Sequence, residues 1–115
     1  MKADKLLGLL GMCRRSGRLT VGFDAVTALC REKQVLLMLA ADASPRTVRQ
    51  LSFQAGETPV YRLPLDREQI AHAIGSAKPI AALATTDPGF IRALHALLTS
   101  PHEEESRYDD QISRQ

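Results

Sequence analysis

The sequence predicts an α/β fold, a three-layer α/β/α sandwich around a small mixed sheet of about four strands. Apolar residues recur at helical spacing in several segments, and these segments alternate with short strand-like runs. Two of the runs, residues 35–41 and 80–84, are apolar at almost every position. Such a run fits a strand buried on both faces, which is typical of parallel neighbours. We place the domain at residues 1–99, because the chain has room for only one.

Helical periodicity predicts a first helix over residues 3–15, ended by Gly17. Residues 18–21 follow as a short strand. Gly22 then opens a second helix, and the apolar run of residues 35–41 is the first buried strand. The residues expected to face inward from the second helix are Val26, Leu29 and Cys30.

Three later helix starts carry a polar residue that can accept a hydrogen bond from the first turn, namely Ser44, Asp66 and Asp87. Pro45 and Pro88 follow two of them, at the first helical position that proline favours. The helices that they open are expected to reach Ala55, Gly75 and Leu98. A short strand at residues 59–63 and the apolar run at 80–84 complete the alternation.

The apolar start of the chain has the hydropathy of a secretion signal but not its pattern. Gly8 and Gly11 interrupt it, and it runs into Arg14 and Arg15 without a small-residue cleavage site. We expect a helix there, with the two glycines allowing a neighbouring helix to pack closely. No apolar run approaches the roughly 18 residues needed to span a bilayer. We therefore expect a cytoplasmic protein without membrane contact.

The charge of the chain is unevenly distributed. The net charge is +2, yet residues 101–115 hold five acidic against two basic residues, and residues 1–100 hold thirteen basic against eight acidic ones. A basic body suits a polyanion-binding surface, although an ordinary solvated surface explains the same excess. The apolar pattern is lost after residue 99, so we predict an acidic, disordered tail at residues 100–115.

The sequence carries no motif for catalysis or for a metal. It lacks both glycine-rich phosphate loops, and its three histidines have no metal-ligand spacing. Asp42, Asp66 and Asp87 each lie at a helix start, where capping accounts for their carboxylates. Cys13 and Cys30 fall on core-facing stripes and are interpreted as buried thiols in a reducing compartment. We expect no catalytic residue, no metal and no cofactor.

Four sequence strings carry a resemblance to a known family. They are LLGLLGMCRRSGRLTVG at the start, VLLMLAADASP in the middle, REQIAHAIG before the last buried strand and ATTDPGFIRAL at the end. In this order, over about residues 4–98, they resemble the kink-turn RNA-binding ribosomal protein superfamily, and its bacterial YlxQ-type branch most of all. The resemblance implies a non-catalytic, ribosome- or translation-associated protein that binds structured RNA, such as ribosomal RNA or a kink-turn.

Proteins of this superfamily read guanine edges from a glycine-led turn into a helix. The resemblance places that turn at Gly22, Phe23 and Asp24. The family follows its glycine with Asn, Glu and Lys, whereas those places here hold Asp24, Ala25 and Ala28. Asp24 keeps an acceptor but loses the amide donor, and neither alanine can form a polar bond to a base. The guanine-reading side chains are therefore altered.

The remaining implied contacts involve two further segments. Ser44 and Val48 match positions beside an extruded nucleotide, and Arg67 and Lys78 match family cations that face the RNA backbone. Basic residues near the end of the first helix are added as phosphate ligands because of their charge, namely Arg14, Arg15 and Arg18.

Two other functions stay open at this point. The altered turn also fits a protein-interaction module of the same fold that has lost RNA binding, with the acidic tail contacting a basic partner or screening the basic body. An enzyme would need a reactive thiol at Cys13 or Cys30, or a buried acid in a clustered pocket.

Overall fold

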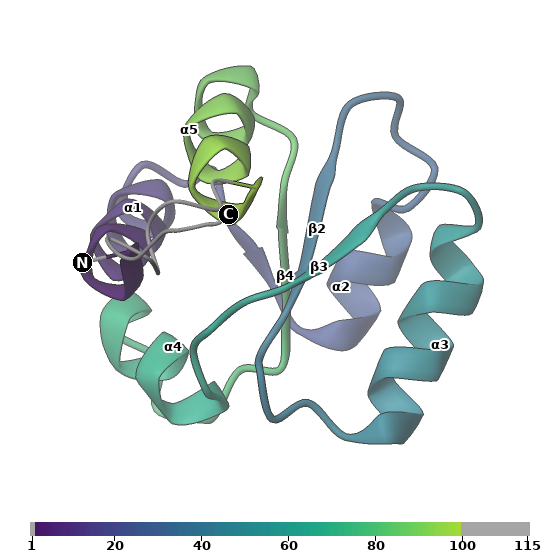
Figure 1. The fold of residues 1–115 in the computed structure, drawn as a ribbon, viewed down its shortest axis with the longest axis horizontal. Helices are drawn as coiled ribbons and strands as arrows, with labels where there is room; N and C mark the ends of the chain where they lie inside the picture. The colour runs from purple at the N-terminus through teal and green to yellow at the C-terminus, as the bar shows by residue number, and fades with distance from the viewer. Residues whose placement is uncertain (1, 100–115) are drawn as a thin grey trace, which may run out of the picture.

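A computed structural model of the chain describes residues 2–99, in which helices cover both faces of one sheet (Figure 1). In chain order the elements are α1 (Lys2–Arg15), β1 (Thr20–Val21), α2 (Phe23–Ala28), β2 (Leu36–Leu39), α3 (Pro45–Ala55), β3 (Val60–Arg62), α4 (Arg67–Ile74), β4 (Ala82–Thr85) and α5 (Pro88–Thr99). The predicted acidic tail, residues 100–115, lies outside the described residues.

Within the described part of the chain, four strands pair in the order β1-β4-β2-β3. Strands β2 and β3 are parallel, whereas β4 runs antiparallel to both β1 and β2. The predicted small mixed sheet is confirmed. The parallel neighbour predicted for a fully buried run is found for β2, which pairs with β3, but not for β4, whose two neighbours are both antiparallel. Cover on both faces favours apolar residues whatever the direction of the strand; the one polar residue of β2 and β4, Thr85, donates its hydroxyl to the Arg18 carbonyl.

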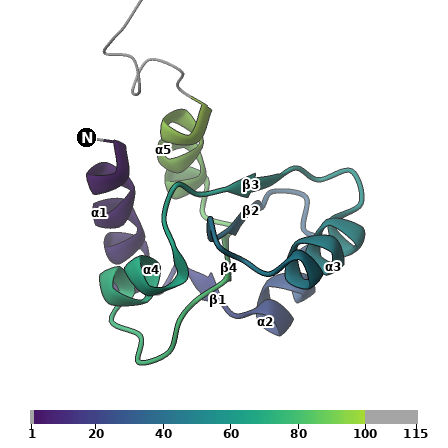
Figure 2. The ribbon, with the colours of Figure 1, turned by 60° about the horizontal axis from the view of Figure 1, so that its bottom comes forward.

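Side chains along the central strands alternate between two cores, one on each face of the sheet (Figure 2). Met38 and Leu83 point into the core formed with α1, α4 and α5. Leu37 and Ala84, one residue away on the same strands, point into the core formed with α2 and α3. The three-layer α/β/α prediction is therefore confirmed.

The observed helix starts follow the predicted caps. Ser44, Asp66 and Asp87 each accept a hydrogen bond from the backbone N–H three residues later, at 3.1, 2.8 and 2.9 Å. At Asp66 the cap is reciprocal, because the Gln69 side chain accepts from the backbone N–H of Asp66. Each cap fixes the point at which the chain leaves the sheet edge and enters a helix.

Strands β2 and β3 begin one residue later than the sequence predicts, and β1 and β4 begin two residues later. The backbone N–H of Arg18 donates to the Cys13 carbonyl at 2.9 Å, and that of Ile80 donates to the Arg67 carbonyl at 3.2 Å. These two backbone N–H groups therefore stabilise loops and take no part in strand pairing. The regular pairing starts only at Thr20 in β1 and at Ala82 in β4.

The two glycines of α1 differ in their surroundings. A Cβ added to Gly11 would lie 3.1 Å from the carbonyl oxygen of Ala73 in α4, whereas a Cβ at Gly8 would meet nothing within 4 Å. The prediction of close helix packing is therefore confirmed for Gly11 and is wrong for Gly8.

This difference predicts unequal effects of alanine. Replacing Gly8 by Ala should raise the free energy of unfolding by about 0.5–1 kcal/mol, because alanine is the better helix former and the space is open. Gly11→Ala brings the same helix preference but presses a methyl group against α4, so its net effect should be less favourable. Urea denaturation of both variants measures the difference. Equal stabilisation by the two would contradict the close contact between α1 and α4.

Candidate nucleic-acid interface

Four connecting segments meet where the strands end on one side of the sheet, at the bottom of Figure 1. We call this edge, residues 22–24, 40–44, 63–67 and 75–81, the loop edge. Backbone hydrogen bonds fasten the segments to each other and to β4: Gly22 N–H to Ala82 O at 3.0 Å, Ala40 N–H to Ala81 O at 2.9 Å, Ala41 N–H to Leu65 O at 2.8 Å and Ile80 N–H to Arg67 O at 3.2 Å. The backbone is thus fixed before any ligand arrives.

The turn from β1 into α2 contributes Gly22, Phe23 and Asp24. Gly22 has a φ of 99° and a ψ of 144°, a conformation that side chains rarely adopt, so glycine is required there. No side chain caps α2, in contrast to α3 and α4. Phe23 is half-buried and Asp24 is exposed. All three predicted residues of this turn therefore lie together on the loop edge.

Arg67, the first residue of α4, is joined to Asp42 in the segment after β2. Its backbone N–H donates to Asp42 Oδ1 at 2.9 Å, and its Nε lies 3.4 Å from Oδ2. Partial desolvation raises the pKa of Asp42, but the hydrogen bonds and positive charge of Arg67 together hold that pKa below its ordinary value. The prediction that Asp42 caps the helix it precedes is wrong, since Ser44 caps α3; the Asp42 carboxylate instead accepts from the first backbone N–H of α4.

Lys78, Ser44 and Val48 also belong to this side of the molecule. Lys78 is exposed in the segment before β4, where Ser76 Oγ accepts from its backbone N–H at 3.2 Å. The Ser44 hydroxyl is used in the α3 cap, and half-buried Val48 packs against the core beneath α3. Of the three, Lys78 is the side chain that presents charge to solvent.

The structure does not bring the other predicted cations to the loop edge. The Arg18 guanidinium lies 3.7 Å from the Asp87 carboxylate, at the edge where β4 ends and α5 begins. Arg14 donates to the Leu19 carbonyl at 3.4 Å, and Arg15 lines a groove between α1 and α4. The basic residues therefore fall into separate regions rather than into one rim.

Two residues that the sequence reading missed lie on the exposed side of α3. Phe53 is 82% exposed, and together with Arg49 and Phe23 it lines a groove of about 390 Å³ between α3 and α2. The signal was the position of Phe53 off the inward stripe of α3, which Leu51 and Ala55 define.

Two features of the described residues concern the catalytic alternative. Among residues 2–99 no group of three or more His, Cys, Asp or Glu side chains is placed to hold a metal ion. Both cysteines are buried, and burial raises the pKa of each thiol. At Cys13 a hydrogen bond with Thr85 and the charge of Arg18 oppose this rise without cancelling it.

No helix in the described part of the chain has the length and hydropathy needed to cross a membrane.

Residues 4–95 match the ribosomal protein L7Ae/L30e/S12e/Gadd45 family. The chain belongs to this family. A Bacillus halodurans protein described as having unknown function shares 31% identity, with a TM-score of 0.72 over 82% of this chain and 96% of that one. The Giardia lamblia 15.5kD RNA binding protein gives a TM-score of 0.69 over 84% of each chain. At 15% identity the second likeness shows the L7Ae fold alone. No curated protein matches the chain.

Cys13 and Cys30 are expected to resist alkylation by iodoacetamide in the folded protein. Burial blocks access, and the raised thiol pKa leaves little thiolate at neutral pH. Mass spectrometry after timed exposure, with urea-unfolded protein as the control, measures the rate at each site. Rapid modification of either cysteine in the native protein would restore the nucleophile hypothesis.

Proposed function

We propose that this chain is a non-catalytic, cytoplasmic RNA-binding protein, associated with the ribosome or with translation, that holds structured RNA against the loop edge. Membership of the L7Ae family over residues 4–95 carries the proposal. The shared fold of a protein described as RNA-binding supports it. We also assign the chain to the YlxQ-type branch, and its 31% identity to a bacterial protein is consistent with that assignment.

In this proposal Arg67 and Lys78 bind phosphates, and the turn at residues 22–24 approaches the RNA backbone. Both cations are exposed, and a backbone hydrogen bond links the segment before β4 to the start of α4. A guanidinium and an ammonium placed together attract phosphate without reading sequence. Ser44 belongs to the loop edge and Val48 to the first turn of α3, and we expect both to give shape to the surface, since the Ser44 hydroxyl is already hydrogen-bonded to Thr47.

Base reading is expected to be weaker than in kink-turn binders. The three altered positions lie on the exposed side of α2 and have no role in the core. They are Asp24, Ala25 and Ala28. A good bidentate contact to a base contributes about 1–3 kcal/mol of discrimination, so two lost contacts cost about 2–6 kcal/mol if they act independently. We therefore propose binding dominated by the RNA backbone. A kink-turn would be favoured for its shape.

Arg14 and Arg18 lie at the other edge of the sheet, so we now assign them no RNA contact. Arg15 lies in the groove between α1 and α4, which meets the loop edge at Asp66, and we assign it no phosphate contact. This narrows the predicted set of phosphate ligands to cations that the loop edge itself carries. Arg18 can therefore serve as a matched control, because it has the same charge as Arg67 and forms a comparable ion pair.

Titration of a kink-turn RNA and of a plain duplex of equal length, over a range of salt concentrations, tests the proposal. Arg67→Gln and Lys78→Gln should each lower the slope of log affinity against log salt by about one, because each removes one phosphate contact. Arg18→Gln should leave the slope unchanged. Equal weak affinity for both RNAs would refute specific recognition. Absence of binding at low salt would refute RNA binding and favour the protein-interaction module.

Asp42→Asn should strengthen RNA binding. The asparagine oxygen can still accept from the Arg67 N–H, while the negative charge that offsets Arg67 and repels phosphate is removed. Because the pKa of Asp42 is lowered, its carboxylate stays charged under mild acid, and its contribution to stability is complete above the ordinary value and lost as the pH falls through the lowered one. Mild acidification should therefore not reproduce the effect of the substitution.

The control for Asp42→Asn is Asp4→Asn, which removes the same charge from the exposed face of α1. Filter binding at neutral pH and low salt compares the two variants with the parent protein. Similar affinities for the two variants would show that Asp42 acts only through net charge.

A further inference from the structure

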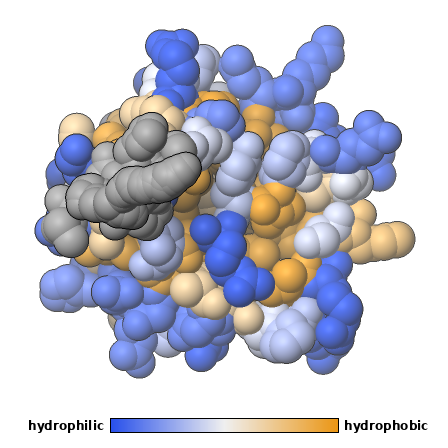
Figure 3. Space-filling view, in the orientation of Figure 1, coloured by the Kyte–Doolittle hydropathy of each residue, from blue (hydrophilic) through white to orange (hydrophobic). Residues whose placement is uncertain are grey.

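The groove between α2 and α3 holds the one exposed aromatic side chain among residues 2–99. Phe53 leaves 82% of its surface in solvent, and a second aromatic ring, Phe23, lies in the same groove. The other lining residues are Arg49, Gln50 and Gln54. Hydrophobic surface stands out among hydrophilic side chains where α3 forms the right-hand edge in Figure 3. The groove therefore combines aromatic, amide and guanidinium groups.

The packing of α3 does not require this arrangement. Leu51 and Ala55 fill the core side of the helix, and Val48 packs beside them. Phe53 lies off that stripe and contributes little to the core, since most of its ring stays in water. The packing of the core therefore does not explain why Phe53 lines this groove.

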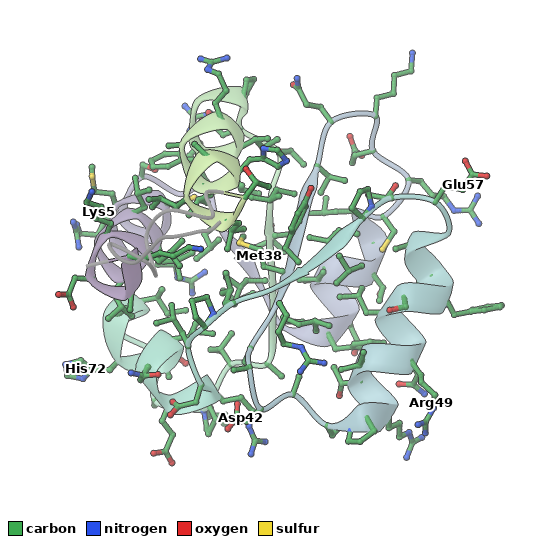
Figure 4. All side chains as sticks on the ribbon, in the orientation of Figure 1. Lys5, Met38, Asp42, Arg49, Glu57 and His72 are labelled. Atoms are coloured by element: carbon green, nitrogen blue, oxygen red, sulfur yellow. The ribbon has the colours of Figure 1, made fainter. Side chains whose placement is uncertain are left out.

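The charge on α3 identifies the kind of ligand that the groove fits. The helix carries Arg46 and Arg49 and no acidic residue from Pro45 to Ala55. Figure 4 shows Arg49 on the lower part of α3, toward the same edge as Asp42, and Glu57 at the opposite end. The end of the groove nearest the loop edge is therefore basic. This charge favours a polyanion over an apolar partner.

The groove is also continuous with the proposed RNA surface. Phe23 lines the groove and is the first residue of α2, directly after Gly22 on the loop edge. A nucleic-acid strand that leaves the loop edge along α2 would therefore enter the groove without leaving the protein surface. This continuity is what distinguishes the groove from an isolated exposed ring.

We propose that this groove binds unpaired nucleotides flanking the structured RNA, with a base stacked on Phe53 and a phosphate held by Arg49. The inference rests on the proposed function and extends it to a single-stranded segment. An aromatic ring accepts any base, because every base has a π-face. The guanidinium matches the geometry of a phosphate, and the amides of Gln50 and Gln54 can both donate to and accept from base edges.

The test compares a kink-turn hairpin with blunt ends against the same hairpin carrying a single-stranded extension of about six nucleotides. The extension is placed at the 5′ end in one RNA and at the 3′ end in another, with 2-aminopurine in the middle. At least one extended RNA should bind about 5- to 150-fold more tightly than the blunt RNA, the range that stacking of one base gives. Stacking should also quench the 2-aminopurine fluorescence.

Phe53→Ala should remove this gain and the quenching while leaving the affinity for blunt RNA unchanged. The side chain is exposed, so the variant should keep the circular dichroism and melting temperature of the parent. Phe53→Leu is the matched control, because it keeps apolar bulk without a π-face, and it should behave like Phe53→Ala. If Phe53→Leu instead keeps the full gain, stacking is overturned, because apolar bulk without a π-face is then enough to hold the extension.

Arg49→Gln should lower the salt slope for the extended RNA by about one and leave that for the blunt RNA unchanged. If blunt RNA binds and neither extension adds affinity, the groove inference is overturned and the proposed function stands. If a free single-stranded oligonucleotide binds through Phe53 and the hairpin does not, the groove inference stands and the proposed function is overturned. If no RNA binds, both are overturned.

Discussion

Strands β2 and β4 are the centre of the sheet, and helices cover both of their faces. Their side chains are therefore apolar at every position except Thr85, whose buried hydroxyl donates to the Arg18 carbonyl at 2.7 Å, while the direction of each strand is left free. The direction that β4 adopts determines where the candidate interface lies. Because β4 is antiparallel to β1 and β2, the segment that precedes it reaches the same edge as the segments that follow those two strands. Lys78 and the Gly22 turn share an edge for this reason. A parallel β4 would have placed Lys78 at the opposite edge.

The elements that depend on neighbours in sequence could be predicted. The caps at Ser44 and Asp66 are contacts over three residues, and the residue type alone indicates them. Contacts between distant segments could not be predicted in this way. Asp42 and Arg67 are 25 residues apart, and only the parallel pairing of β2 with β3 brings them together. The place of Arg18 likewise depends on the register of Thr20 with Ala84, which no local pattern reports.

The candidate site shows the same division. Gly22 and Arg67 were found because a family pattern points to single positions. Phe53 was missed because helical periodicity identifies the residues that face the core and gives no role to those that face away. Its partner Phe23 lies on another helix, so the groove exists only once α2 and α3 are packed against the same face of the sheet. A pairing of this kind is a property of the tertiary structure.

The balance of charge around the loop edge is uneven and favours one direction for a bound polyanion. On the edge itself Asp42 offsets part of the charge of Arg67. Beyond it, α3 adds Arg46 and Arg49 without any acid of its own. Attraction between exposed charges falls off within about 10 Å at moderate salt, so the nearest unopposed cations set the path of the strand. An RNA held at the loop edge would therefore be drawn toward α3, where the proposed stacking on Phe53 needs no particular base. Recognition in this chain would then shift from reading guanine edges to holding the backbone and stacking an unpaired base, which is consistent with alanine at two of the base-reading positions.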